Sequence, residues 1–417
     1  MKDERRQQWI IVAVLFVTMF LIWGPINASS VFFIPVVKHF AWSRALFSLL
    51  VATAPLAAGF SSPALGSLMD RYGERRIMIT GAAMVGLGFL ALSRADSAIA
   101  FLAVFIVLGV GISASTIIPT ALVLTNWFRE RRGLALGVAF SGIPLGGAGV
   151  TILANRIVEH GGFRAGYIAM GLPILFVVIP LLAIFMRARP IDEGDETVSD
   201  AMQEALPGLE VREALRSRSF WLFGIADLVF AMAGVGLRVH LVPLLTGIGY
   251  SATAAAEIFG AMFLFSAVGT FLVGRIADRM GGRATLAMIF VIAAAGMAAL
   301  LGASHIAAVA AFIVIFGLVR ETPPALVPIA LTESLGRRRL GTLLGILALF
   351  NTFGFAIGPV IAGGIFDRSG SYTGALVLFA ALALIAMLAI RATLPLAEEK
   401  TRLELAGAGA AEPLTSR

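Results

Sequence analysis

Twelve long apolar runs, separated by short polar loops, constrain this chain more than any other feature. A transmembrane helix needs about 20 predominantly apolar residues. Runs of that kind extend over 9–36, 45–69, 77–93, 99–126, 134–157, 166–187, 219–245, 253–276, 285–303, 307–335, 341–366 and 374–392. Each run must satisfy its own backbone hydrogen bonds in lipid, so each is predicted to be a helix. The sequence therefore predicts an all-α membrane protein with twelve transmembrane helices.

The composition agrees with this fold class. Of the 417 residues, 59% are hydrophobic and only 14% are charged, whereas about a quarter of the residues of a typical soluble domain are charged. Lipid must therefore cover most of the exterior. The absence of cysteine excludes disulfides and thiolate metal sites, and the four histidines lack the HExxH spacing of a zinc site. We predict no metal and no cofactor.

The basic residues lie at the ends of the apolar runs. The net charge of +7 would suit a nucleic-acid partner only if the basic residues shared one polar face. They cluster instead in alternate loops, which is the pattern of the positive-inside rule. We therefore exclude nucleic acid as a partner, and we predict a bacterial-type inner membrane protein with both termini in the cytoplasm.

The longest polar stretch divides the predicted helices into two groups of six. We predict an N-terminal half (1–187), a cytoplasmic linker (188–218), a C-terminal half (219–395) and a tail (396–417). The tail ends in AGAGAAEP, which offers little apolar surface to bury, so the tail is predicted to be disordered.

The two halves repeat each other at a constant offset of 208 residues. GSLMDRYGERR (66–76) recurs as GRIADRMGGR (274–283), and ERRGLALG (130–137) recurs as RRLGTLLG (338–345). Homologous six-helix halves predict a pseudo-two-fold axis along the membrane normal, with a binding site between the halves near mid-membrane.

The string GxxxDRxGxRR in the first of these segments resembles the signature loop of the major facilitator superfamily. An aspartate at a helix end can neutralise an arginine and the adjoining helix N-terminus, and so latch the halves together on the cytoplasmic side. The residues predicted to have this gating role are Asp70, Arg71, Arg75, Asp278 and Arg279. The alternative is that these charges only set the topology.

Within that superfamily the chain most resembles the monocarboxylate transporter and oxalate/formate antiporter branch. The stretches that carry the resemblance include RRGLALGVAFSGIPLGG (131–147) and GPVIAGGIFDRSGSY (358–372). The resemblance implies a small organic anion, moved with a proton or exchanged for another anion. The chain departs from the animal members at the places of their eighth-span Asp and Arg, where Ser266 and Thr270 stand, and Asn27 falls near the place of their first-span lysine.

Charged residues inside the apolar runs are the functional candidates, because burying a charge in the membrane is costly and such residues usually face a cavity. Arg238 is the first choice for a substrate carboxylate, which a guanidinium can bind with two hydrogen bonds. Its repeat equivalent is Ser30. The alternative is that Arg238 reaches the outer interface, since Pro243 would end the helix only five residues later.

Arg320, Glu321 and Asp227 are the other candidates among the charges in the apolar runs. We predict substrate binding for Arg320. Neighbouring helical residues point about 100° apart, so Arg320 and Glu321 are not expected to pair with each other. Glu321 is the preferred proton carrier because a buried carboxyl binds protons more readily, and Asp227 is the second candidate. The alternative for Arg320 and Glu321 is a structural ion pair with another span.

Polar groups that could complete the pocket are Asn27, Ser30, Ser115 and Asn351. Together these features predict a secondary active transporter of a monocarboxylate-like anion, proton-coupled or exchanging, that works by alternating access. The alternative is an exporter of drugs or a carrier of neutral solutes on the same fold. No Walker A, HExxH or GxSxG arrangement supports an enzyme. The predicted partners are a small-molecule carboxylate and membrane lipid, and the predicted state is a monomer.

Overall fold

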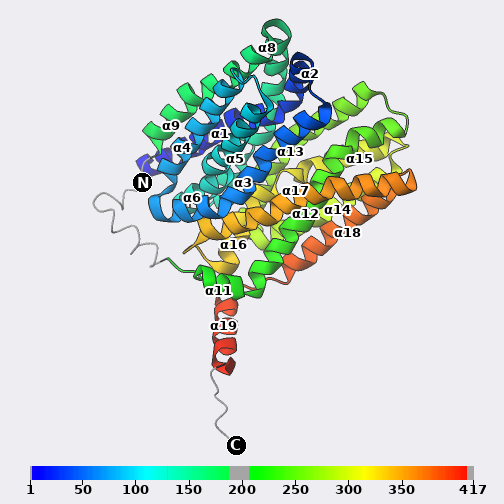
Figure 1. Ribbon diagram of the computed structural model, residues 1–417. Helices are drawn as coiled ribbons and strands as arrows, with labels where there is room; N and C mark the ends of the chain where they lie inside the picture. Colours follow the sequence, from blue (N-terminus) through cyan, green and yellow to red (C-terminus); the bar gives the residue numbers. More distant parts are fainter. Residues whose placement is uncertain (1, 129, 187–205, 411–417) are drawn as a thin grey trace, which may run out of the picture.

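The computed structural model describes residues 2–128, 130–186 and 206–410, and the described part is helical apart from one isolated β-bridge (Figure 1). The helices of the N-terminal half are α1 (Lys2–Asn27), α2 (Ser29–Phe40), α3 (Arg44–Tyr72), α4 (Glu74–Leu92), α5 (Ala98–Ser115), α6 (Ile117–Trp127), α7 (Arg132–Phe140), α8 (Gly142–Pro173), η1 (Ile174–Val178) and α9 (Ile179–Phe185). Those of the C-terminal part are α11 (Val211–Arg216), α12 (Arg218–Gly247), α13 (Ala252–Met280), α14 (Gly282–Ala299), η2 (Leu300–Gly302), α15 (Ile306–Arg320), α16 (Pro323–Leu335), α17 (Leu340–Ser369), α18 (Thr373–Arg391) and α19 (Leu396–Ala410).

These helices form twelve spans, as predicted. Ten apolar helical stretches of the described chain are long enough to cross a membrane, and α15 with α16, bent by 47°, makes an eleventh. The stretch Arg132–Phe185 contains 54 residues, which is enough for two spans. Gly162 divides it, because its φ of 76° and ψ of 172° are not helical, and the twelfth span results.

Three of the predicted spans are interrupted along their length. The first bends at Ala28, between α1 and α2, and the fourth at Thr116 (φ −120°, ψ −100°), between α5 and α6. The tenth breaks between α15 and α16, where Pro323 and Pro324 follow. Proline has no backbone N–H to continue a helix. Broken helices at mid-membrane expose backbone groups where transporter sites are usually built.

Helix α19 corrects the prediction of a disordered tail for residues 396–410. Glu398 and Glu399 lie in its first turn, where acidic side chains favour the helix N-terminus. Glu399 is fully buried and its Oε2 accepts the Ser219 hydroxyl of α12 at 2.6 Å. Residues 411–417 of the tail and 188–205 of the predicted linker lie outside the described residues.

The two halves meet most closely through α3 against α17 and α7 against α13. We call the side of the bundle where α1 begins and α18 ends the termini face (Figure 1). Near this face Gly66 lies against Gly341, and Gly133 lies against Gly274. A Cβ on any of these glycines would overlap a carbonyl oxygen or a carboxylate oxygen of the opposite half. Backbone-to-backbone contact of this kind needs small residues. The two pairs are equivalent in the repeat, since Gly66 corresponds to Gly274 and Gly133 to Gly341.

Candidate functional site

Asp70 joins the halves at the termini face. It lies at the end of α3 and is 7% exposed. Its Oδ1 accepts the Gly341 N–H at 3.1 Å, and its Oδ2 accepts the Thr342 N–H at 2.8 Å and the Thr342 hydroxyl at 2.7 Å. N–H groups in the first turn of a helix lack a partner inside that helix. Asp70 of one half therefore caps α17 of the other.

Asp278 makes the equivalent contact in the opposite direction. Its Oδ1 accepts the Gly133 N–H at 2.6 Å and its Oδ2 accepts the Leu134 N–H at 2.8 Å, in the first turn of α7. Asp278 is exposed, and it lines a surface recess with Arg131, Arg275 and Arg279. We call these two contacts the Asp70 latch and the Asp278 latch.

The remaining residues predicted to act in gating lie near the latches without joining the halves. The Arg75 guanidinium donates to the Ala183 carbonyl at 2.5 Å, which ties α4 to α9 inside the N-terminal half. Its repeat equivalent, Arg283, donates to the Thr393 hydroxyl at 2.9 Å beyond α18. Arg71 packs over the Tyr72 ring at 5.3 Å. The aspartates, and not these arginines, therefore make the contacts between the halves.

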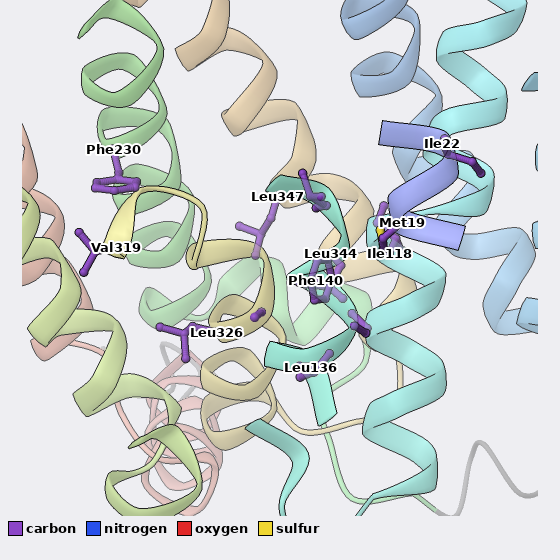
Figure 2. Close-up of a cluster of buried hydrophobic side chains, with 14 of the residues drawn as sticks. Met19, Ile22, Ile118, Leu136, Phe140, Phe230, Val319, Leu326, Leu344 and Leu347 are labelled. Atoms are coloured by element: carbon purple, nitrogen blue, oxygen red, sulfur yellow. The ribbon is translucent and has the colours of Figure 1, made fainter. Parts of the chain in front are cut away.

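Buried apolar side chains from both halves gather in one cluster (Figure 2). The N-terminal half contributes Met19, Ile22, Ile118, Leu136 and Phe140, and the C-terminal half contributes Phe230, Val319, Leu326, Leu344 and Leu347; all are 7% exposed or less. Ile22 and Phe230, Ile118 and Leu326, and Leu136 and Leu344 are equivalent positions of the repeat. With this cluster buried and both latches made, the two halves are joined near the termini face.

Arg320 and Glu321 form an ion pair, with Nη2 and Oε1 2.7 Å apart. The prediction that these neighbours would not pair is wrong. It assumed a continuous helix, whereas α15 ends at Arg320 and Glu321 has φ −101° and ψ 15°. The break lets both side chains turn the same way.

The Arg320 side chain is only 4% exposed, and two aromatic rings of α13 hold it. Its guanidinium carbon lies 5.7 Å from the ring centre of Phe259 and 4.7 Å from that of Phe263, distances typical of cation–π contact. Nη2 has the Glu321 carboxylate as its partner, whereas Nη1 is buried without a hydrogen-bond partner among the described residues. The Arg320 guanidinium is therefore held in place, and it keeps N–H donors that a ligand could use.

Arg238 belongs to the same charged region. It is half-buried on α12, with its guanidinium carbon 5.9 Å from the ring centre of Phe355 on α17. It also lies within electrostatic reach of Arg320 and Glu321. Helix α12 continues through Pro243 to Gly247, so Arg238 lies farther from the helix end than the interface alternative assumed.

Asp227 lies on the same helix as Arg238, nearer the termini face. It is half-buried, and its Oδ1 accepts a hydrogen bond from the Asn351 amide at 3.1 Å. Within the described ranges no Lys, Arg or His nitrogen comes within 4.0 Å of its carboxylate. The structure thus joins Asp227 and Asn351, which the sequence analysis had placed in different roles.

The other predicted pocket residues differ in whether they have a hydrogen-bonding group free for a ligand. Asn27 is half-buried, and its Nδ2 is buried with no hydrogen-bond partner among the described residues; the same holds for Nε1 of Trp23, one turn earlier on α1. Ser115 is fully buried, and its hydroxyl donates to the Gly111 carbonyl at 2.6 Å, which leaves it no open surface. Ser30 belongs to α2, and its side chain lies outside what the structure describes.

His240, two residues from Arg238, has a structural role. Its ring nitrogens lie 3.0 Å from the Tyr372 hydroxyl and 3.0 Å from the Pro359 carbonyl oxygen, so it ties α12 to α17 and to the start of α18. Burial, with the nearby Asp367 carboxylate, raises the pKa of Tyr372 above its usual value, which keeps the phenol neutral. Among the described residues, no group of three or more His, Asp and Glu could hold a metal ion.

Two sets of residues were missed by sequence reasoning. Gly341 and Thr342, whose N–H groups donate to Asp70, could have been found from the repeat, because Gly341 ends the RRLG segment that matches ERRG before α7 and Thr342 follows it. Phe259 and Phe263, which hold Arg320, stand in an apolar run without any local signal. Their role depends on α13 packing against α15.

Twelve spans in two halves related by an internal repeat are an architecture that many transporters share. The family model described as Major Facilitator Superfamily matches residues 14–320 and 241–416. The chain belongs to the Major Facilitator Superfamily.

Relatives and solved structures agree with this assignment. The chain is 26% identical to monocarboxylate transporter 13 of Bos taurus over 393 residues, covering 93% of this chain and 89% of the relative. It is 25% identical to the MFS-type transporter YcxA of Bacillus subtilis over 392 residues, covering 89% and 91%. The fold matches the transporter FucP, solved in the outward conformation, with a TM-score of 0.71 at 14% identity, covering 92% and 99%. It also matches the human organic anion transporter MFSD10, with a TM-score of 0.71 at 16% identity and the same coverage.

Proposed function

We propose that this protein is a secondary active transporter of a small, monocarboxylate-like organic anion, moved by rocking the two halves around a mid-membrane site. The observation that carries this proposal is the surplus of hydrogen-bond donors there. Nη1 of Arg320 is buried without a hydrogen-bond partner among the described residues, as is Nδ2 of Asn27, and Nη2 of Arg320 has only the ion-pair contact with Glu321. Donors buried without acceptors are costly, and arginine can only donate. A ligand that supplies acceptors, such as a carboxylate, relieves this cost.

The balance of charges supports a monovalent anion with one proton. Arg320 and Glu321 neutralise each other in their ion pair. The other two candidate charges are Arg238 and Asp227, which balance each other when both are ionised. If the anion binds at Arg238 while a proton neutralises Asp227, the loaded site is again balanced, which limits the cost of reorienting it in the membrane.

The same geometry ranks the two proton-carrier candidates. Glu321 forms an ion pair with Arg320 at 2.7 Å, and protonation of Glu321 would give up that pair. Asp227 has only the neutral Asn351 amide, so it gains more from binding a proton. We therefore propose Asp227 as the principal carrier, with Glu321 second, which reverses the order reached from the sequence.

The names of similar proteins point the same way. The names of monocarboxylate transporter 13 and the organic anion transporter MFSD10 both refer to anions. The alignment with monocarboxylate transporter 13 covers most of this chain and most of that relative. The clusters of arginine at the termini face favour a cytoplasmic location for both termini. We propose a bacterial-type inner membrane location and a monomer as the working unit.

The proposal is tested by ligand-induced thermal stabilisation of the purified protein. The panel contains mono- and dicarboxylates, with sugars, amino acids and cationic drugs as contrasts. We expect a monocarboxylate to raise the melting temperature, and Arg238→Gln and Arg320→Gln to abolish that rise. Arg164→Gln, an exposed arginine paired with Asp96, is the matched control and should keep it. Stabilisation by cations or neutral solutes alone would contradict the anion assignment and indicate a drug or neutral-solute carrier.

The proton carrier is tested separately in liposomes. Asp227→Asn cannot bind or release a proton, so we expect it to lose uptake driven by a pH gradient while it still exchanges labelled for unlabelled substrate. If Asp227→Asn retains gradient-driven uptake and Glu321→Gln loses it, the order of the two carriers is wrong.

A further inference from the structure

The end of the linker is joined to the loop that precedes α17. The Leu209 N–H donates to the Leu335 carbonyl at 2.9 Å, and the Arg337 N–H donates to the Pro207 carbonyl at 2.9 Å. These bonds flank an antiparallel bridge between Gly208 and Gly336. We call this contact between residues 207–210 and 335–339 the linker clamp.

Side chains reinforce the linker clamp. The Glu210 carboxylate pairs with Arg338 at 2.8 Å and with Arg339 at 3.1 Å. Glu210 also begins α11 through a capping box with Glu213, which fixes its backbone. Leu209 is 2% exposed, so the clamp includes an apolar anchor as well as charges.

Only glycine fits at the centre of the clamp. Gly336 has φ +84°, and a Cβ there would overlap the Cα of Gly208 and the carbonyl oxygen of Pro207. A Cβ on Gly208 would lie 2.8 Å from the Arg338 nitrogen, which is closer than real Cβ contacts. The two backbones therefore touch without intervening side chains, and the loop can occupy little other than this position.

The clamped loop leads directly into the Asp70 latch. Arg339 is followed by Leu340 and then by Gly341 and Thr342, whose N–H groups Asp70 accepts. Arg339 is also within electrostatic reach of Asp70. Fixing residues 335–339 thus fixes the donors that Asp70 must meet, and preorganised donors bind more strongly than mobile ones.

The Asp278 latch has a different kind of support. Of the corresponding residues before α7, Trp127 and Phe128 are held by the start of α1: the Gln8 amide donates to the Trp127 carbonyl at 3.0 Å, and the Trp9 ring packs edge-on against that of Phe128. Among the described residues of this segment (127, 128, 130 and 131) no β-bridge to the linker is found. Arg131 instead occupies the left-handed region, with φ 58°.

From this difference we propose that the linker clamp controls the gate: docked on residues 335–339, the linker end holds α17 where Asp70 can cap it, and its release opens the termini face. The linker is then a point at which events outside the membrane can change the equilibrium between the two states of the transporter. This proposal rests on the fold and the latches, and it is independent of the substrate.

The test uses the full-length chain, which contains no cysteine, so spin labels can be placed without removing native thiols. Tyr72→Cys and Met280→Cys, which are 49% and 55% exposed, report the distance between the halves at the termini face. A long distance between the labels marks molecules that are open at the termini face. We expect Gly336→Ala to increase the fraction of such molecules more than about tenfold, because the new Cβ would overlap the backbone of Pro207 and Gly208 and prevent the clamp from forming. Glu210→Gln keeps the backbone bridge and should increase that fraction about two- to fivefold, as expected for partly exposed ion pairs.

Matched controls separate the clamp from general effects of substitution. Gly247→Ala places a Cβ in open space at the other end of α12, and Glu404→Gln removes an exposed charge from α19; neither should change the distances. Asp70→Asn shows the response to an opened latch. Glu210→Gln also serves if Gly336→Ala fails to fold. The proposal is overturned if Asp70→Asn lengthens the distance while the clamp variants leave it unchanged, or if Glu210→Gln shortens it.

Discussion

The Asp70 and Asp278 latches occupy equivalent positions of the repeat, and each caps the first turn of a helix in the opposite half, but water reaches them differently. Asp70 is 7% exposed, whereas Asp278 is exposed and lines an open recess. Asp70 accepts three hydrogen bonds and Asp278 accepts two. The same motif therefore does not give the two latches the same strength.

Three neighbours account for this difference. Thr342 supplies a hydroxyl to Asp70, and its repeat equivalent, Leu134, has none. The Leu122 side chain lies beside Gly341, at the Asp70 latch. Its repeat equivalent at the Asp278 latch is the smaller Ala330. The linker clamp fixes the loop that leads to the donors of Asp70, and the described residues before α7 have no such bridge to the linker. Charge-assisted hydrogen bonds are stronger where water is excluded, so the Asp70 latch should dominate the closed state.

The largest effect is expected for Asp70→Asn. The substitution removes the charge, and the new amide group meets N–H donors in a buried place, so we expect the closed state to lose about 2–4 kcal/mol relative to the open state. The distance between labels at positions 72 and 280 measures this shift. A distribution unchanged from that of the labelled parent would contradict the dominance of this latch.

Thr342→Val isolates the additional hydrogen bond of the Asp70 latch. Valine keeps the shape of threonine and removes the hydroxyl, so the closed state should lose about 1 kcal/mol. Leu134→Thr is the converse change and should strengthen the Asp278 latch by less, because water competes there. The two variants are compared with the same label pair, and equal responses would show that burial does not distinguish the latches.

Asp278→Asn is expected to weaken the closed state by only about 0.5–1 kcal/mol, the cost of losing an exposed helix cap. This effect should be no larger than that of Thr342→Val, although a whole carboxylate is changed. Added salt should reduce the difference in closed-state stability between the parent protein and Asp278→Asn, since exposed charges are screened. A response as large as that of Asp70→Asn would refute the comparison.

Arg75→Gln should leave the distance between the halves unchanged, because its hydrogen bond to Ala183 lies within one half. We expect a loss of about 1 kcal/mol in stability instead, seen as a lower melting temperature. Arg283→Gln, the equivalent change in the other half, is the control. A change in label distance would show that Arg75 acts in gating, as the sequence had suggested.

Much of the fold could be read from the sequence. The length of each apolar run marks a span, because lipid allows only helices that satisfy their own backbone. The offset of 208 residues identifies the two halves and the aspartates that join them, because equivalent segments fold alike. The candidate charges Arg238, Arg320, Glu321 and Asp227 were also visible, since charges are rare in apolar runs.

The partners of those charges were decided by the tertiary structure. Arg320 pairs with Glu321 because α15 ends between them, and Asp227 meets Asn351 because α12 packs along α17. The sequence alone determined where charges enter the membrane, through the local run of apolar residues around each one. Only the tertiary structure determined which charges are neutralised and which latch is buried, because pairing and burial depend on helix breaks and neighbours far apart in the chain.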